Sequence, residues 1–322
     1  MEKDARIFVA GHRGLVGSAI VRALTAAGYA NLILRPRAEL DLLDRAAVRR
    51  FFEAEKPEYV FIAAARVGGI VDNNTYPAEF IYENVLIAAH LIDQSWRSGV
   101  KRLLYLGSSC IYPRDCPQPI REDYMLTGPL EVTNRAYALS KIAGVEMCWS
   151  YNREYGTKFL AAMPTNLYGP GDRYDLEGSH VIPAMILKFH QAKKLSAREV
   201  VLWGTGAPLR EFLYSEDAGV ALTHLMCLPE GEFVRACGDV RLAPLVNVGS
   251  AVELTIRELA GKVARVVGFE GALVFDSTRP DGTPRKLLDV SRMTSLGWAA
   301  KVGLDEGLRL AYADFLARHA EA

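Results

Sequence analysis

A tyrosine followed four residues later by a lysine is the first pattern in the chain that suggests chemistry. Tyr137 and Lys141 lie at the start of a predicted helix over 137–155, where this spacing places both side chains on one helical face. A positive charge beside a phenol lowers the pKa of its hydroxyl group, which would make Tyr137 a usable acid near neutral pH. The pattern is common by chance, so its weight depends on what accompanies it.

Small polar side chains precede this pair. A predicted strand over 102–106 runs through Gly107 into Ser108, Ser109 and Cys110, which supply two hydroxyl groups and a thiol. Ligands of open α/β sheets bind at the carboxyl ends of the strands, where these residues are expected. Taken alone, Cys110 is equally compatible with a small buried residue, the commonest fate of a free cysteine.

Three glycines follow the first predicted strand. The strand covers 6–10, the glycines are Gly11, Gly14 and Gly17, and a predicted helix covers 18–27. Glycines permit a tight turn and a close approach of the backbone, and a helix N-terminus offers N–H groups to a pyrophosphate. An ordinary turn is the alternative, but the flanking strand and helix favour a dinucleotide-binding loop.

Arginines occur where an NAD-binding protein usually has an acidic residue. Asp or Glu is expected about 20 residues after the glycines, where it holds the ribose 2′-hydroxyl. The predicted second strand, 31–34, is instead followed by Arg35 and Arg37, and Arg13 lies inside the glycine loop. Guanidinium groups suit a 2′-phosphate, so the sequence favours NADP(H) over NAD(H). Solvated surface arginines are the alternative.

Strands and helices alternate along the first half of the chain. Predicted strands cover 59–65, 102–106 and 160–164, and predicted helices cover 46–55, 79–99 and 137–155. This alternation predicts an α/β fold, namely a Rossmann-type doubly wound parallel sheet with a smaller α/β substrate-binding lobe. Strands at 212–214 and 245–248 and a helix at 216–228 are predicted to return to the same sheet. The predicted domains are 1–169 plus 212–249 for NADP binding and 170–211 plus 250–322 for substrate binding.

The composition argues against several classes of protein. The 322 residues carry 38 Lys or Arg and 38 Asp or Glu, so bulk charge gives no basis for binding nucleic acid. No apolar run approaches the roughly 20 residues that cross a bilayer, and no signal peptide is visible. The five cysteines include no Cys-x-x-Cys pair, so neither a disulfide framework nor a metal site is expected. A cytoplasmic location fits these features.

Taken in order, Gly-x-x-Gly-x-x-Gly, Ser-Ser-x-x-Tyr and Tyr-x-x-x-Lys resemble the extended short-chain dehydrogenase/reductase family over essentially the whole chain. In particular, the chain resembles the epimerase-reductases that act on GDP-4-keto-6-deoxy-D-mannose. The segments that carry this resemblance are 11–14, 65–70, 73–77, 107–113, 163–170, 179–183 and 280–286.

The resemblance implies a reaction in two stages. The ketosugar would be inverted at carbons 3 and 5 by a base and an acid, which match Cys110 and His180, and NADPH would then reduce carbon 4. Ser108 and Tyr137 would hydrogen-bond the carbonyl oxygen, and Tyr137 would supply the proton that completes the reduction. Lys141 would also bind the nicotinamide ribose. Free cysteine and histidine have pKa values of about 8.5 and 6.5, which suit proton transfer near neutrality.

The resemblance also implies the binding residues. NADP(H) would contact Gly11, His12, Arg13, Gly14, Leu15, Val16, Gly17, Arg37, Asp41, Leu42, Leu106, Gly107, Ser108, Ser109, Tyr137, Lys141, Pro164, Asn166, Leu167 and His180. The GDP sugar would contact Lys188, Trp203, Arg210 and Asp281, with Arg285 and Lys286 ranked below them. Trp203 as a plain core residue is the alternative. Family members are typically homodimers that pair the helices at 79–99 and 137–155, and no membrane or nucleic-acid partner is expected.

Three related proteins would differ at named positions. A 4,6-dehydratase would carry Thr-Asp-Glu where this chain has Ser108, Ser109 and Cys110. A simple 4-epimerase, which keeps tightly bound NAD, would typically carry an acidic residue after the second strand. A non-catalytic dinucleotide sensor of the same fold would commonly lack the tyrosine or the lysine, and both Tyr137 and Lys141 are present.

Overall fold

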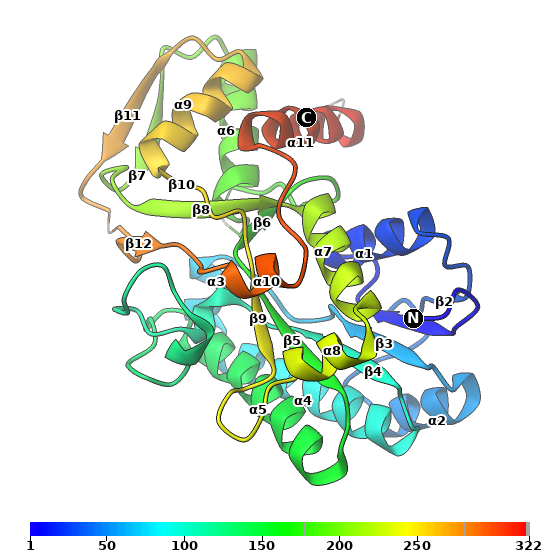
Figure 1. The fold of residues 1–322 in the computed structure, drawn as a ribbon. Coiled ribbons are helices and arrows are strands. Elements are labelled where there is room, and N and C mark those ends of the chain that lie inside the picture. The colour runs from blue at the N-terminus through cyan, green and yellow to red at the C-terminus, as the bar shows by residue number, and fades with distance from the viewer. Residues whose placement is uncertain (177, 280, 320–322) are drawn as a thin grey trace.

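A computed structural model describes residues 1–176, 178–279 and 281–319; Pro280, at the start of the last segment of the resemblance, lies outside them. Six parallel strands form the central sheet in the order β2-β1-β3-β4-β5-β9 (Figure 1). Their bounds are β1 Ile7–Ala10, β2 Leu32–Ile33, β3 Tyr59–Ile62, β4 Arg102–Leu106, β5 Phe159–Pro164 and β9 Leu245–Val248. The predicted α/β fold with a parallel sheet is confirmed.

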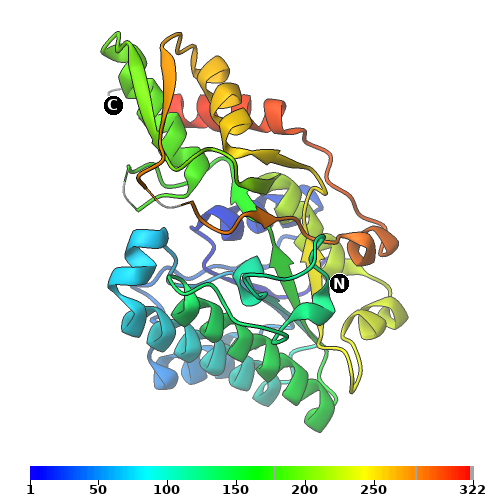
Figure 2. The same cartoon turned by 90° about the vertical axis from the view of Figure 1, so that its left-hand side faces the viewer.

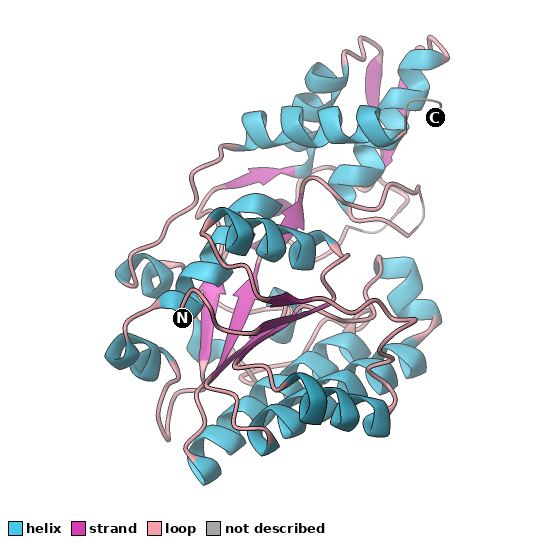
Figure 3. Ribbon diagram, turned by 90° about the vertical axis from the view of Figure 1, so that its right-hand side faces the viewer, coloured by secondary structure: helices cyan, strands magenta, loops and turns pink. Residues whose placement is uncertain are grey.

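Helices cover both faces of this sheet (Figures 1 and 3). One face packs against α1 (Leu15–Ala26) and α7 (Ser215–Cys227), and the other packs against α2 (Arg45–Glu55), α4 (Pro77–Arg97) and α5 (Arg135–Tyr155). Every residue of β1, β3 and β4 is buried, because alternate side chains point into one helical layer or the other.

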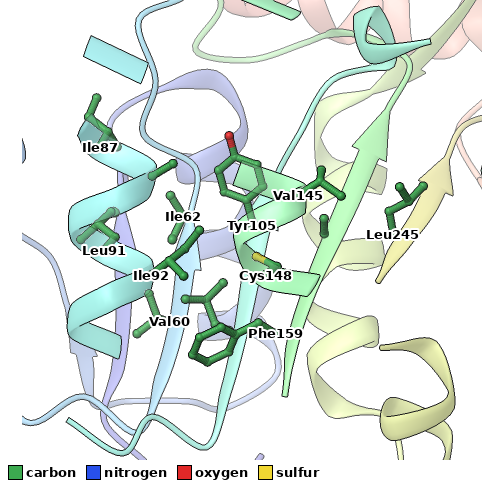
Figure 4. Close-up of a cluster of buried hydrophobic side chains, with 14 of the residues drawn as sticks. Val60, Ile62, Ile87, Leu91, Ile92, Tyr105, Val145, Cys148, Phe159 and Leu245 are labelled. Atoms are coloured by element: carbon green, nitrogen blue, oxygen red, sulfur yellow. The ribbon is translucent and has the colours of Figure 1, made fainter. Parts of the chain in front are cut away.

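The core beneath α4 and α5 shows this packing in detail (Figure 4). Leu91 of α4 and Val145 of α5 belong to one buried apolar cluster with Val60 and Ile62 of β3 and Tyr105 of β4. Burying an aliphatic side chain of this size stabilises the fold by roughly 1.5–3 kcal/mol. The strands are therefore anchored along their length, and so are the polar residues that follow their carboxyl ends.

The strand order reverses beside β1. The chain passes from β1 to β2 on one side and then crosses to β3 on the other side of β1. At such a switch point the loops that follow the strands diverge and leave a crevice. The segments after β1, β3 and β4, which carry the predicted nucleotide-binding and catalytic residues, line a common cleft here.

A second group of elements lies above the central sheet in the views of Figures 1 and 2. Its strands are β6 (Asn166–Tyr168), β7 (Glu199–Trp203), β8 (Leu209–Tyr214), β10 (Glu253–Thr255), β11 (Ala272–Asp276) and β12 (Arg285–Lys286). Strand β8 pairs with β6, β10 and β12, and β7 pairs with β11. Helices α6 (Val181–Lys194), α9 (Ile256–Val267) and α11 (Leu304–Arg318) surround a separate apolar cluster with these strands.

One predicted strand belongs to a different sheet. The sequence predicts residues 212–214 in the central sheet, but they form the end of β8 in the second group of elements. Phe212 is in parallel register with Asn166, and Arg210 is in antiparallel register with Leu254. A short apolar run is compatible with either sheet, and only these distant partners decide between them. Strand β9 does return to the central sheet as predicted.

Helix α1 begins three residues earlier than predicted, because Gly14 itself is its N-cap. The remaining short helices are α3 Ile70–Thr75, η1 Ser109–Ile111, η2 Glu122–Tyr124, α8 Glu230–Ala236 and α10 Ser291–Ser295. In the described ranges, no helix has the length and apolar character to span a membrane.

Candidate active site

A cleft of about 1550 Å³ lies where the second group of elements faces the carboxyl ends of the central strands. The first-ranked residues predicted for catalysis and binding all line it: residues 11–17, Arg37, Asp41, Leu42, residues 106–110, Tyr137, Lys141, Pro164, Asn166, Leu167, His180, Lys188, Trp203, Arg210 and Asp281. Of the two lower-ranked candidates, Lys286 lines the cleft and Arg285 does not. Across the part of the chain that the structure describes, no group of three or more His, Cys, Asp or Glu side chains could hold a metal ion.

The glycine loop forms a close-fitting turn at the start of α1. Gly11 has a φ of +82°, and a Cβ there would lie 2.6 Å from the backbone N of Ala64. A Cβ on Gly17 would lie 2.1 Å from the carbonyl oxygen of Gly11, so neither glycine tolerates a side chain. No side chain caps α1 at Gly14, and no acidic residue occupies its first turn. The first N–H groups of the helix are therefore left for an anion.

Two arginines at the β2 end of the cleft carry unpaired charge. Among the described residues, Arg13 and Arg37 make no hydrogen bond or ion pair, and both are exposed. Arg35 is different, because its guanidinium group binds Glu55 at 2.5 Å and approaches Glu39 at 3.9 Å. An open glycine cradle with free guanidinium groups beyond it fits NADP(H), and Arg13 and Arg37 are the residues available to a 2′-phosphate.

Lys141 is fixed beneath the phenol of Tyr137. Its side chain is 3% exposed, and its ammonium group donates a hydrogen bond to the carbonyl oxygen of Leu106 at 2.8 Å. The Nζ atom lies 5.6 Å from the ring centroid of Tyr137 and 5.0 Å from that of Tyr105. The Tyr105 ring fits there because Gly144 has no side chain; a Cβ would lie 2.3 Å from its Cζ atom. Burial lowers the pKa of Lys141 to about 8.

The pKa of Tyr137 shifts in the direction opposite to the prediction. Burial of the phenol raises its pKa, and the thiol of Cys110 raises it further, whereas Ser108 lowers it. The loss of hydration of a buried phenolate is the largest cause of this shift. Tyr137 is consequently protonated at neutral pH, which is the state that a proton donor requires.

Ser108 and Cys110 form the turn that follows β4. Gly107 precedes them, and a Cβ there would lie 2.0 Å from the Cε atom at the flexible end of the Met163 side chain. Ser108 then caps η1, and its Oγ accepts a hydrogen bond from the backbone N of Cys110 at 3.4 Å. Burial raises the pKa of the Cys110 thiol, while the positive charges of Lys286 and Lys141 lower it.

His180 reaches the cleft from a different part of the fold. It is the N-cap residue of α6, with φ −68° and ψ 167°, and its side chain makes no capping hydrogen bond. The imidazole is open to the cleft, and the partial loss of surrounding water lowers its pKa from 6.5. Cys110 follows a strand of the central sheet, so the thiol and the imidazole enter the cleft from separate elements.

The four predicted substrate contacts line the part of the cleft built by the second group of elements. Lys188 of α6 donates a hydrogen bond to a backbone carbonyl of β7, and burial lowers the pKa values of Lys188 and Arg210. The side chain of Trp203 is 63% exposed, which excludes the alternative of a core residue. The Asp281 carboxylate accepts hydrogen bonds from the backbone N (3.0 Å) and Oγ1 (2.7 Å) of Thr205.

Two further residues line the cleft: Asn134, which the sequence does not predict as a site residue, and Lys286, which it ranks below the four substrate contacts. Asn134 is the N-cap residue of α5, yet its side chain makes no capping bond, and its buried Oδ1 atom has no partner among the described residues. An asparagine before a helix is normally explained by capping, so the sequence conceals its access to the cleft. Lys286 lines the cleft near Cys110.

Comparison with known proteins gives a consistent assignment. Residues 7–234 match the NAD dependent epimerase/dehydratase family. The chain is 53% identical to GDP-L-fucose synthase 1 of Arabidopsis thaliana, over 97% of this chain and 93% of the relative. It is 50% identical to GDP-L-fucose synthase of Escherichia coli K12, over 97% and 96% of the two chains. A GDP-mannoheptose C4 reductase from Campylobacter jejuni, solved with NADP bound, is 36% identical and superimposes with a TM-score of 0.88, covering 98% and 99% of the chains. The chain therefore belongs to the NAD dependent epimerase/dehydratase family and, within it, to the GDP-L-fucose synthases.

Proposed function

We propose that this protein converts GDP-4-keto-6-deoxy-D-mannose to GDP-L-fucose by 3,5-epimerisation followed by NADPH-dependent reduction at carbon 4. The observation that carries the proposal is the cleft in which a glycine-rich nucleotide loop meets Cys110, Tyr137, Lys141 and His180. Reduction of a ketone alone needs a proton donor and its partners. The additional thiol and imidazole are the groups that an inversion of carbon centres requires.

The glycine loop holds the pyrophosphate of NADP(H) at the N-terminus of α1, and Arg13 and Arg37 bind the 2′-phosphate. Bound NADPH supplies the hydride that reduces the ketone. Lys141 holds the nicotinamide ribose, in addition to its contact with the end of β4.

Cys110 and His180 carry out the inversions. A ketone at carbon 4 acidifies the protons on carbons 3 and 5, so a base can remove each proton and leave an enolate. Cys110 acts as the base on one face of the sugar, and His180 returns a proton to the other face. Ser108 and Tyr137 donate hydrogen bonds to the oxygen on carbon 4 and stabilise the negative charge that develops there.

Tyr137 completes the reduction by donating its proton to the alkoxide oxygen on carbon 4. Its raised pKa keeps the proton in place until the alkoxide, a much stronger base, forms. The positive charge of Lys141 below the ring stabilises the phenolate that remains.

Cations and a flat ring bind the GDP group. Lys188 and Arg210 neutralise the diphosphate, and the exposed face of Trp203 packs against the sugar nucleotide. Asp281 has lone pairs beyond the two that Thr205 occupies, and these accept a hydrogen bond from a hydroxyl or a base N–H group.

The proposal extends to assembly, domains and location. Tyr82, Leu139 and Tyr155 are 64, 37 and 44% exposed on α4 and α5, which supports a homodimer that pairs these helices. Light scattering should then give twice the monomer mass of 35.5 kDa, and Tyr82→Glu should lower the measured mass towards that of one monomer.

The division of the chain into an NADP-binding domain (1–169 plus 212–249) and a substrate-binding domain (170–211 plus 250–322) is retained as a proposal. A cytoplasmic location is consistent with five free cysteines.

Isotope exchange tests the reaction directly. The protein is mixed with GDP-4-keto-6-deoxy-D-mannose in deuterated water, first without and then with NADPH. Deuterium should enter carbons 3 and 5 without the cofactor, and GDP-L-fucose should form when NADPH is added. Cys110→Ser should abolish exchange but retain NADPH binding, whereas Cys227→Ser, which changes an exposed cysteine outside the cleft, should behave as wild type. Reduction without exchange would identify a plain 4-ketoreductase instead.

A further inference from the structure

Lys286 is held in a fixed position in the wall of the cleft. It is the second residue of β12, and the chain directly after it is tied on two sides. The backbone N of Leu288 donates to the buried carboxylate of Glu211 at 3.0 Å, and the backbone N of Ile120 donates to the carbonyl oxygen before Leu288 at 2.7 Å. Ile120 belongs to the loop that follows Cys110, so the strand carrying the lysine and the loop carrying the thiol are bonded together.

The side chain of Lys286 points into the cleft and is unpaired. Arg285, its neighbour in the strand, binds Glu253 through two hydrogen bonds of 2.8 and 2.6 Å. Successive side chains of a strand point to opposite faces, so Lys286 points away from Glu253 and lines the cleft. It makes no hydrogen bond or ion pair within the described ranges, and burial lowers its pKa. An unpaired ammonium group that is half-buried is costly, so its presence calls for an anion in the cleft.

Among the titratable groups around Lys286, Cys110 is the one that interacts with it most strongly. The titratable and charged groups that face the thiol are Lys286 of β12, Lys141 and Tyr137 of α5, and Tyr105 of β4. The groups that face the ammonium group are Cys110, Cys116 and Glu131 from the loop after β4, and Arg210 of β8. Apart from burial, Lys286 has the largest effect on the pKa of Cys110, and Cys110 has the largest effect on that of Lys286. Cys110 and Lys286 line the same cleft, on a loop and a strand that are hydrogen-bonded to each other.

We propose that Lys286 is a positioning residue that stabilises the thiolate of Cys110 and thereby sets the fraction of enzyme ready to abstract a proton from the sugar. This inference rests on the proposed role of Cys110 as the base.

The proton transfer balances without any further reactant. The thiolate sulfur takes the proton from carbon 3 or carbon 5, and the electron pair of the broken C–H bond forms the enolate. Cys110 becomes a neutral thiol, and the negative charge moves to the oxygen held by Ser108 and Tyr137. Lys286 keeps its proton throughout. Its ammonium group therefore stabilises the Cys110 thiolate before the transfer and has no anionic partner once the thiol is neutral.

Alkylation of the free enzyme tests the pairing without relying on catalysis. The thiolate is the reactive form of cysteine, so the rate of carbamidomethylation of Cys110 by iodoacetamide, followed by peptide mass spectrometry from about pH 7 to 11, reports the pKa of the thiol. Lys286→Met should move the midpoint upward by about one unit, which lowers the rate at pH 7 about tenfold. Lys286→Arg should keep the midpoint near that of wild type. Arg285→Met removes a cation from the opposite face of the same strand and should not change it.

Each outcome decides between the pairing and its alternatives. An unchanged midpoint in a folded Lys286→Met variant, or equal shifts in Lys286→Met and Arg285→Met, would overturn the inference. A raised KM for the sugar nucleotide with an unchanged midpoint would assign Lys286 to the diphosphate instead. If Lys286→Met does not fold, Lys286→Gln takes its place in the same measurement: an upward shift of the midpoint supports the pairing, and an unchanged midpoint overturns it. Normal deuterium exchange by Cys110→Ser would refute the role of Cys110 as base, whereas the alkylation result would still measure the pairing.

Discussion

Replacing Arg37 by serine should weaken NADPH binding about tenfold and leave NADH binding unchanged. A hydrogen bond to a charged group contributes about 1.5–3 kcal/mol, and 1.4 kcal/mol corresponds to a tenfold change in the dissociation constant. Because Arg37 is exposed, water and salt screen its charge, so the lower end of that range applies. The double variant with Arg13→Ser should lose about 100-fold if the two contacts act independently.

The assay is a fluorescence titration of each variant with NADPH and, separately, with NADH. Arg35→Ser is the matched control, because that guanidinium group is already bound to Glu55 and should not affect the preference for either cofactor. Parallel losses of NADPH and NADH affinity in Arg37→Ser would show that the arginine does not contact the 2′-phosphate. A change of preference in the Arg35 variant would place the phosphate site elsewhere.

Three further results are expected. Tyr137→Phe should lower turnover by roughly 10²–10⁴-fold with little change in NADPH affinity, because it removes only the proton donor. Single-turnover reduction measures the rate, and cofactor titration measures the affinity. Turnover at the wild-type rate would contradict the role of Tyr137 as proton donor. Asn134→Ala should raise the KM for the sugar nucleotide severalfold without changing cofactor binding, because Asn134 lines the cleft and its buried Oδ1 atom lacks a donor that a substrate hydroxyl group would supply. An unchanged KM in steady-state assays would count against that contact. The initial rate of deuterium exchange should have a broad plateau against pH, because the active form needs both a thiolate at Cys110 and an imidazolium at His180. Between the lowered pKa of His180 and the raised pKa of Cys110, the thiolate fraction rises with pH as fast as the imidazolium fraction falls, so the rate stays constant. Below this range the rate falls with the thiolate fraction, and above it the rate falls with the imidazolium fraction. A narrow optimum between the ordinary pKa values of the two groups, about 6.5 and 8.5, would contradict these two shifts.

Local patterns predicted the nucleotide-binding half of the fold. The first strand, the glycine turn and the helix after it depend on neighbouring residues, and the largest difference is the start of α1, where Gly14 serves as the cap. The strand at 212–214 could not be assigned in this way. The sheet of β8 is decided by the pairing of Phe212 with Asn166 and of Arg210 with Leu254, partners that are about 45 residues away along the chain. A short apolar run does not indicate which strands it will pair with.

The chemical state of the site was less predictable than its location. Spacing correctly brought Tyr137 and Lys141 together, but the direction of the phenol pKa depends on burial by elements distant in sequence. Lys286 ranked low for the same reason. Only the pairing of β12 with β8 and the alternation with Arg285 show that it points into the cleft. The roles assigned to the individual site residues stay predictions until the variants are measured.

The contact between Tyr105 and Gly144 has a consequence for how this sequence can evolve. The aromatic ring that faces the Lys141 ammonium group occupies the space a side chain at position 144 would need, with only 2.3 Å between a Cβ and the ring. A mutation to alanine at position 144 is therefore tolerated only after position 105 has lost its ring. If Gly144→Ala comes first, the single variant has a side chain that clashes with the Tyr105 ring and is destabilised. The two positions should covary among relatives, and Gly144→Ala should be rescued by Tyr105→Leu in stability measurements.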